Sequence, residues 1–280
     1  MGDSEQPALS CVPASEHPRV ERSFLSIPAL ISNRLLKLIG NSTKPLSYCF
    51  HFFFPNKRFT LPELSAPILG SRRPTEIPKI VWQTHFTNRV TLPMYLNYLA
   101  NRLMAADHEY RFVGDDAQRE FMHAHMPKTV ADAYENLLDG AAKADLWRVC
   151  ALLHHGGSYI DIDAHLVWPL SRLIKPADSE LILYNRSDYS NYFIASRKEH
   201  AILKETVDLI VDNITKRNVG KGVYDLTGPT TLNKALEAKT FRFLPFRRVC
   251  IQGSFTNEYF QYIDKPGSKW THKKTSELLK

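Results

Sequence analysis

Two aspartates near the middle of the chain are spaced so that they could act together. Asp161 and Asp163 stand at the end of the segment Ser158–Asp163, whose alternation of residue types predicts a half-buried strand. Side chains two residues apart on a strand point to the same face, so the two carboxylates should project together from its carboxyl end. Neighbouring carboxylates repel each other unless a cation lies between them. Mg²⁺ or Mn²⁺ bound to a diphosphate meets that requirement.

The segment before this strand carries a second charged pair. Residues 141–155 place apolar residues at helical spacing without glycine or proline, and Gly156-Gly157 predicts the end of that helix. Asp145 and Arg148 are three residues apart and therefore share one face, which leads toward the aspartates. Taken alone, such a pair is more often an ordinary helix salt bridge, and a lone Asp-x-Asp is more often solvated surface charge.

The combination is more specific than either pair. Asp-x-x-Arg on a helix, Gly-Gly, a strand containing Tyr159 and then Asp161-Ile162-Asp163 resembles the DxD sugar-binding region of glycosyltransferase family 32. That family includes bacterial capsule and lipopolysaccharide enzymes, fungal mannosyltransferases and, more distantly, the clostridial glucosylating toxins. The resemblance covers residues 77–270. It implies an α/β fold of the GT-A type, with a mostly parallel central sheet flanked by helices and a ligand site at the carboxyl ends of its strands.

The resemblance also implies roles for these residues. Asp163 would ligate Mn²⁺ or Mg²⁺, and Asp161 would hold the ribose or a metal-bound water. Asp145 and Arg148 would grip the hydroxyls of the donor sugar, and Tyr159 would line the donor site. We therefore predict Asp145, Arg148, Asp161 and Asp163 as the catalytic residues.

A tryptophan in the first predicted strand is a candidate for binding the nucleotide. Trp82 lies in the run Lys79–Gln83, which reads as a strand of β-branched and aromatic residues. It resembles a tryptophan of the family that stacks on the nucleotide base, and an indole face offers stacking area to any base. Without the resemblance, Trp82 would be assigned to the core.

The C-terminal stretch from residue 266 to 272 resembles a closing loop of the family that folds over the donor diphosphate. Ser268 can donate to a phosphate or ligate a metal, and Trp270 can donate through its indole nitrogen. Many members have a histidine before the glycine, whereas here His272 follows Gly267. His272, Ser268 or Asp264 would then complete the metal shell. The alternative is that residues 265–280 form a frayed basic tail.

Two shorter motifs resemble further family positions. Asn191 opens a predicted strand that would lie under the acceptor, and Thr227-Gly228-Pro229 predicts a helix start with proline in its first position. A helix start can also hold an anion or a sugar hydroxyl. Both motifs are explained equally well by simple turns.

Composition bounds the class of protein. The 280 residues are 44% hydrophobic and 23% charged, which is typical of a globular chain, and the net charge is +7. An acidic partner is expected, such as a nucleotide-sugar or an anionic membrane; no nucleic-acid-binding motif is present, so no nucleic-acid partner is predicted. Cys11, Cys49, Cys150 and Cys250 show no metal-binding spacing and are predicted to be free thiols in a reducing compartment.

We predict two parts, residues 1–75 and a glycosyltransferase domain of residues 76–280. The first part would comprise a disordered start, a basic amphipathic appendage over residues 22–62 and a proline-rich linker. The appendage contains no Asp or Glu, and five apolar residues share one face of a possible helix before the aromatic cluster Tyr48–Phe54: Ile27, Leu30, Ile31, Leu35 and Leu38. Such a segment can lie in an anionic membrane interface or pack its apolar face on the domain.

The sequence leads to an expected cellular location and an expected reaction. No signal peptide or membrane span is visible, so we predict a cytoplasmic protein, either free or peripheral on the cytoplasmic face of a membrane. The predicted reaction is metal-dependent, retaining transfer of a hexose from a UDP-sugar, in preference to a GDP-sugar, to a glycan or lipid-linked acceptor in polysaccharide biosynthesis. The alternatives are a DxD metal-dependent hydrolase or nucleotidyltransferase and a non-catalytic membrane-surface binding protein.

Overall fold

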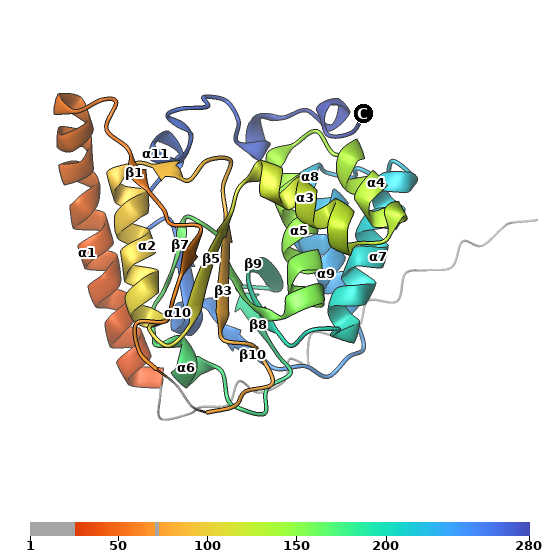
Figure 1. The fold of residues 1–280 in the computed structure, drawn as a ribbon, viewed down its shortest axis with the longest axis horizontal. Helices are drawn as coiled ribbons and strands as arrows, with labels where there is room; N and C mark the ends of the chain where they lie inside the picture. Colours follow the sequence, from red (N-terminus) through yellow and green to blue (C-terminus); the bar gives the residue numbers. More distant parts are fainter. Residues whose placement is uncertain (1–25, 71–72) are drawn as a thin grey trace, which may run out of the picture.

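A seven-stranded sheet lies at the centre of the computed structural model, which describes residues 26–70 and 73–280 (Figure 1). Residues 1–22, which were predicted to be disordered, and Cys11 within them lie outside the described part of the chain. The strand order is β10-β8-β9-β6-β3-β5-β2. In chain order the strands are β2 (Leu64–Ser65), β3 (Ile80–Thr84), β5 (Glu109–Val113), β6 (Gly157–Ile160), β8 (Glu180–Asn185), β9 (Asp188–Ser196) and β10 (Phe243–Pro245).

The sheet is mostly parallel, as predicted. Strand β3 pairs in parallel with β5 and β6, and β8 pairs in parallel with β10. Strand β9 is antiparallel to both β6 and β8, and β2 is antiparallel to β5. Within the described chain, five of the seven strands of this sheet therefore run in one direction. The predicted α/β fold class is confirmed.

Two short antiparallel ladders lie beside the sheet. Strand β1 (Phe59–Thr60) pairs with β4 (Arg89–Val90), and β7 (Ala164–Leu166) pairs with β11 (Cys250–Gln252). The second ladder begins directly after the Asp-x-Asp motif. It therefore brings the chain near residue 252 back to the aspartates.

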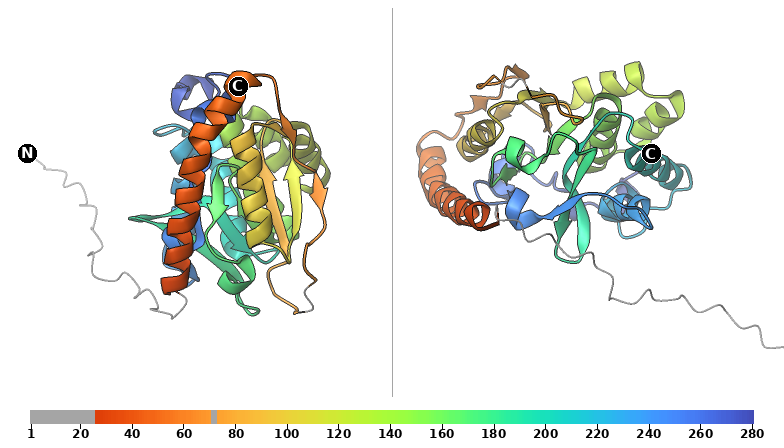
Figure 2. Two further views of the ribbon diagram at one scale, coloured as in Figure 1. Left: turned by 90° about the vertical axis from the view of Figure 1, so that its left-hand side faces the viewer. Right: turned by 90° about the horizontal axis from the view of Figure 1, so that it is seen from below.

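Helices cover both faces of the sheet (Figures 1 and 2). On one face lie α3 (Asp115–His125), α4 (Lys128–Asn136), α5 (Gly140–His155), α7 (Ala201–Thr215), α8 (Val223–Leu226) and α9 (Pro229–Leu236). On the other lie α2 (Leu92–Met104), α6 (Leu170–Leu173) and α10 (Phe246–Val249), with α1 (Ser26–Phe53) outermost. The chain continues through α11 (Glu258–Tyr262) and the 3₁₀ turns η1 (Trp270–His272) and η2 (Thr275–Glu277).

The central strands are buried on both sides because helices cover both faces of the sheet. Successive residues of a strand point to opposite faces, so they enter two different cores. Val81 and Ile160 pack in the core beneath α2, whereas Trp82, Tyr159 and Ile182 pack in the core beneath α5, α7 and α9. Apolar residues thus follow one another along β3 and β6. This pattern predicts a buried strand but does not tell which residue faces which core.

The central helix ends where the Gly156-Gly157 pair predicts, and a cap that was not predicted marks its start. The Asp139 carboxylate accepts hydrogen bonds from the amides of Ala141 and Ala142 at 2.9 and 3.0 Å, which caps the start of α5. The helix ends at His155, the capping residue Gly156 has a φ of +71°, and Gly157 follows with a φ of +108°. Both glycines have the left-handed backbone that favours this residue.

Replacing Gly157 by alanine is expected to lower the free energy of unfolding by roughly 2–4 kcal/mol. A Cβ atom there would lie 2.8 Å from the Ile80 carbonyl oxygen and 2.9 Å from Nε1 of Trp82, in addition to the backbone strain. Urea denaturation measures the loss. Gly140→Ala is the matched control, because a Cβ at this helical glycine meets nothing within 4 Å. An equal effect of the two changes would contradict this account of the turn.

The segment before residue 76 is packed against the rest of the described chain. Helix α1 runs through Phe53, so the aromatic cluster continues the predicted helix. Asn33 Nδ2 donates to the Arg247 carbonyl oxygen at 2.7 Å, and the Leu92 amide donates to Nε2 of His51 at 3.1 Å. Strand β1 comes from the end of the predicted appendage and pairs with β4, and β2 comes from the predicted linker and pairs with β5. The division at residue 75 stays a prediction.

Candidate functional site

The two aspartates lie in a turn at the carboxyl end of β6. The strand ends at Ile160, so the prediction that it continues to Asp163 is wrong. Its pairing with β9 stops at Ile160 opposite Phe193, and the amide of Ala164 donates to the Asp161 carbonyl oxygen at 2.9 Å to close the turn. Both carboxylates nevertheless line one cavity of about 580 Å³. Its walls include residues 84–86 at the carboxyl end of β3, as expected for an open α/β sheet.

The cavity brings together most of the predicted site residues. Those that line it are Asp145, Arg148, Tyr159, Asp161, Asp163, Ser268 and Trp270. Trp82 and His272 are not among the lining residues. Asn191, from one of the two shorter motifs, also lines the cavity.

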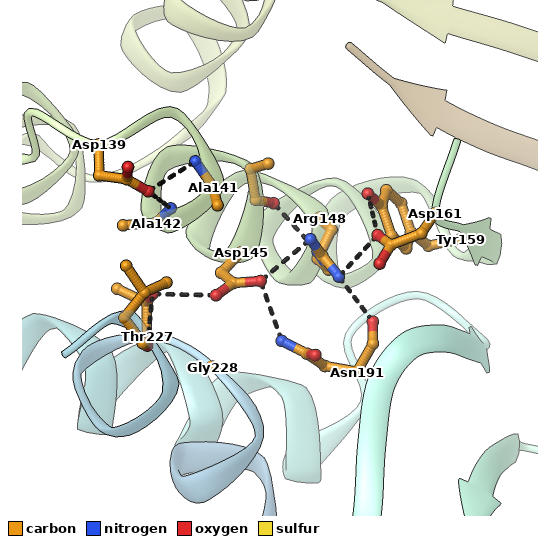
Figure 3. Close-up of polar contacts among 12 residues, drawn as sticks. Asp139, Ala141, Ala142, Asp145, Arg148, Tyr159, Asp161, Asn191, Thr227 and Gly228 are labelled. Atoms are coloured by element: carbon orange, nitrogen blue, oxygen red, sulfur yellow. Dashed lines mark hydrogen bonds and ion pairs between the residues drawn. The ribbon is translucent and has the colours of Figure 1, made fainter. Parts of the chain in front are cut away.

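Asp145 is held by side chains from three parts of the chain (Figure 3). Its Oδ1 lies 3.0 Å from Nη2 of Arg148 and accepts a hydrogen bond from Nδ2 of Asn191 at 3.0 Å. Its Oδ2 accepts from the Thr227 hydroxyl at 3.0 Å. Gly228 is the N-cap of α9 and Pro229 is its first residue, as predicted. The motif therefore starts a helix and also directs Thr227 toward Asp145.

Arg148 connects this group to the Asp-x-Asp turn. Its Nη1 lies 3.1 Å from Oδ1 of Asp161 and donates to the Asn191 carbonyl oxygen at 2.8 Å. Its guanidinium lies 4.3 Å from the centre of the Tyr159 ring, and the Tyr159 hydroxyl donates to the same Asp161 oxygen at 2.9 Å (Figure 3). Arg148 is buried, so these contacts fix the Asp161 carboxylate in place.

Asp163 receives its hydrogen bonds from two glutamines far along the chain. Gln252 Nε2 donates to Oδ2 of Asp161 at 3.0 Å and to Oδ1 of Asp163 at 3.2 Å. Gln261 Nε2 donates to Oδ2 of Asp163 at 3.2 Å. Neutral amides hold the two carboxylates near each other without cancelling their charge.

The pKa values reflect this shortage of positive charge. Burial, with the Asp161 carboxylate adding to it, raises the pKa of Asp163 from 3.8 to about 6. Burial also raises the pKa of Asp145 to about 6, against the opposing effect of Arg148. Burial raises the pKa of Asp161 too, while Arg148 and hydrogen bonds from Tyr159 and Gln252 oppose the rise. A cation bound at the turn would stabilise the ionised forms.

Trp82 occupies the core position that was the alternative to base stacking. Its side chain is buried, and Nε1 donates to the Gly156 carbonyl oxygen at 3.0 Å. His155 stacks on the ring at a centroid distance of 5.4 Å, and the Arg111 guanidinium lies 5.0 Å from the ring centre. Other aromatic rings line the cavity, among them Tyr159, Phe86, Tyr262 and Trp270.

The C-terminal stretch contributes some of its residues to the cavity but not all of them. Ser268 and Trp270 line it, with Lys265, Lys269 and Lys273 nearby in the same wall. His272 instead places Nε2 3.1 Å from the Glu258 carboxylate. The final residues are not frayed, because Leu278 and Leu279 are buried and the Leu138 amide donates to the Leu278 carbonyl oxygen at 2.8 Å.

The donor set fits a hard divalent cation only in part. Within the described residues, no group of three or more His, Cys, Asp or Glu side chains is arranged to hold a metal. Asp161 and Asp163 offer two carboxylates, and Mg²⁺ is commonly held by one or two carboxylates together with water and substrate phosphates. The site therefore suits a metal that arrives with a diphosphate. His272 does not line this cavity and lies beside Glu258.

The comparisons with known proteins agree with this site. Residues 81–185 match the family model described as a glycosyltransferase sugar-binding region containing the DXD motif. The chain is 26% identical over 225 residues to the initiation-specific alpha-1,6-mannosyltransferase of Candida albicans. That match covers 63% of this chain and 58% of the relative, so the chain spans little more than half of the relative's length.

Solved structures of glycosyltransferases are also similar in part. The PaToxG glycosyltransferase shares 18% identity over 75% of this chain and 79% of its own, with a TM-score of 0.46. The ligand-free glycosyltransferase domain of the YGT toxin shares 12% identity over 57% of this chain and 56% of its own, with a TM-score of 0.37.

The family match contains the helix with Asp145 and Arg148 and the turn with Asp161 and Asp163. The resemblance inferred from these motifs is thus confirmed. Residues 81–185 therefore carry a glycosyltransferase sugar-binding region that contains the DXD motif.

Proposed function

We propose that the chain transfers a hexosyl group from a nucleoside diphosphate sugar to a hydroxyl of a glycan or lipid-linked acceptor. The observation that carries the proposal is the convergence of Asp145, Arg148, Asp161 and Asp163 on one cavity. Its volume of about 580 Å³ is within the usual range for a ligand of this size. A UDP-sugar is the donor that the sequence resemblance favours. The similar mannosyltransferase makes a mannosyl donor the first alternative.

The residues of the cavity support a division of roles. Asp161 and Asp163 would hold Mn²⁺ or Mg²⁺, and Lys265, Lys269 and Lys273 add positive charge in the same cavity. A metal bound there would neutralise the charge that develops on the leaving diphosphate. Phe86 and Tyr262, whose rings lie 6.5 Å apart and nearly parallel, offer stacking area for the base in place of Trp82.

The buried Asp145–Arg148 pair would bind the sugar and position the turn. Both Asp145 oxygens already accept hydrogen bonds, and the residue lines the cavity between Arg148 and Thr227. This arrangement suits Asp145 as a fixed acceptor of hydrogen bonds from sugar hydroxyls better than as a nucleophile. We propose retention of the anomeric configuration by same-face displacement, on the strength of the family resemblance.

A panel of nucleotide-sugars tests the proposal. The protein with Mn²⁺ should release free nucleoside diphosphate from one donor, and EDTA should abolish the release. Proton NMR of the released or transferred sugar reads the anomeric configuration. Cleavage that yields nucleoside monophosphate, or no cleavage of any UDP- or GDP-sugar, would contradict the proposal.

The pH dependence of donor binding provides a separate test. A carboxylate must lose its proton to ligate a metal, and the pKa of Asp163 is about 6. Metal-dependent donor affinity should therefore be constant above pH 7 and fall about tenfold per pH unit below pH 6. Calorimetric titration between pH 5 and pH 8 measures this profile. An affinity that does not change across this range would contradict the assignment of Asp163 as a ligand.

A further inference from the structure

Helix α1 has its amphipathic pattern reversed relative to the protein. The residues that it buries against the domain are small or polar, namely Ala29, Asn33, Gly40, Ser47 and His51. The residues that it exposes are mainly large and apolar. A helix of a globular protein normally turns its apolar side inward. This reversal needs an explanation because exposed apolar area is unfavourable in water.

The exposed apolar side chains share one face of α1, here called the apolar stripe, which Asn41 and Ser42 interrupt. Ile27, Ile31, Leu38, Leu46 and Phe53 follow one another at spacings of four, seven or eight residues, which keeps them on one face. They are 56–72% exposed, and Leu35 and Phe52 extend the stripe with exposures of 56% and 79%. Figure 2 shows α1 as the outermost element on its side of the molecule. A helix of 28 residues makes this stripe about 42 Å long.

The orientation of the helix is fixed by specific contacts. Asn33 and His51 hydrogen-bond to the backbone of residues 247 and 92, and Lys44 donates to the Gly253 carbonyl oxygen. A Cβ on Gly40 would lie 2.9 Å from backbone atoms of Ser254, so the two backbones approach closely. Rotating α1 to bury its apolar stripe would break all these contacts. The stripe is therefore an outward surface of the folded domain.

The charge around the stripe indicates what covers it. Residues 26–62 contain no Asp or Glu. Arg34, Lys37 and Arg247 line a groove of about 480 Å³ beside the apolar residues Ile27 and Ile31. None of these three cations forms an ion pair with a carboxylate in the described part of the chain. Apolar side chains with flanking unpaired cations complement an anionic lipid surface.

We infer that the outer face of α1 docks onto an anionic lipid bilayer and lies in its interface. No helix in the described ranges is long and apolar enough to cross a membrane, so the contact is with the surface. A second copy of the chain is a poorer occupant. Pairing of two stripes, whether parallel or antiparallel, would bring the cations of both copies together, and like charges repel each other. Anionic headgroups would neutralise these cations instead. The inference does not depend on the proposed glycosyl transfer.

Flotation with lipid vesicles tests the inference on the full chain without any donor. The wild type should float with vesicles of phosphatidylcholine containing phosphatidylserine, float less with phosphatidylcholine alone, and bind less at high salt. The variant L38E/L46E should lose at least about tenfold in bound fraction, since two exposed apolar side chains become anionic. The control L69E/L103E changes leucines that are 60% and 71% exposed elsewhere and should float like the wild type.

Circular dichroism melting checks that each variant is folded, which is expected because every substituted leucine is exposed. No flotation of the wild type, or equal flotation of wild type and L38E/L46E, overturns the inference. Light scattering that shows a dimer, dissociated by L38E/L46E in the absence of lipid, also overturns it and identifies a second copy as the occupant. Nucleotide-sugar cleavage is read separately, so failure of one proposal leaves the other standing.

Discussion

Replacement of Asp163 by asparagine is expected to lower donor cleavage by roughly 10²–10³-fold while leaving the fold intact. The change removes the charge that would ligate the metal but keeps the shape and one of the two hydrogen bonds accepted from Gln252 and Gln261. Because burial raises the pKa of Asp163 to about 6, the ionised carboxylate destabilises the metal-free fold at neutral pH. The variant should therefore melt at the same temperature as the wild type or higher at pH 7.5. That advantage should vanish as the pH falls through 6 toward 4.

Asp116→Asn is the matched control for this prediction. Asp116 is an exposed aspartate in the first turn of α3 and does not line the cavity. Steady-state cleavage with saturating Mn²⁺, together with calorimetric melting, separates loss of activity from loss of structure. Unchanged activity in Asp163→Asn, or a large fall in its melting temperature, would disprove the assigned role.

Replacement of Arg148 by methionine should damage both stability and activity. The change leaves the buried Asp145 and the half-buried Asp161 without their shared cation, and losing one partner of a buried ion pair typically costs about 3–5 kcal/mol. The cost should be smaller at pH 5 than at pH 7.5, because the unpaired carboxylates can then bind protons. Donor cleavage should fall roughly 10²-fold or more, since Asp161 loses the contact that orients it.

Two further variants make the Arg148 prediction specific. Arg119→Met removes an exposed arginine that pairs with Glu135, and it should cost no more than about 1 kcal/mol. Combining Arg148→Met with Asp145→Asn removes one stranded charge and should recover part of the stability but none of the activity. Urea denaturation measures these differences. If Arg148→Met is as stable as Arg119→Met, the buried pair does not organise the site.

Local signals in the central segment predicted its helix and the point where that helix ends. Helical spacing through residue 155 and the Gly156-Gly157 stop act within a few residues of one another, so they can be read directly, whereas the Asp139 cap was not predicted. The end of β6 depends on where pairing with β9 stops, opposite Phe193, and no local signal marks that point. The strand prediction therefore overran by three residues.

Trp82 and α1 illustrate what residue patterns cannot decide. Strand β3 is apolar on both faces, so its pattern does not show whether Trp82 faces the core or the donor. The periodicity of α1 correctly predicted a helix over residues 27–38, but hydrogen bonds made by Asn33 and His51 determine which side packs inward.

The remaining contacts of the site join residues distant in sequence. Gln252 and Gln261 lie 89 and 98 residues from Asp163, and neither belongs to a motif. Thr227 reaches Asp145 across 82 residues through a turn that was predicted only as a helix start. Such contacts follow from the tertiary fold, here from the β7–β11 ladder and the packing of α9, and are invisible to spacing rules.

Calorimetric titration of UDP and GDP into the protein, with and without Mn²⁺, tests the central claim most directly. We expect one nucleotide to bind the wild type in a Mn²⁺-dependent manner, Asp163→Asn to lose that binding and Asp116→Asn to keep it. Binding that is equally strong without metal, or unaffected by Asp163→Asn, would show that the Asp-x-Asp turn does not hold a metal–diphosphate. The absence of binding by either nucleotide would contradict the assignment of the cavity as the donor site.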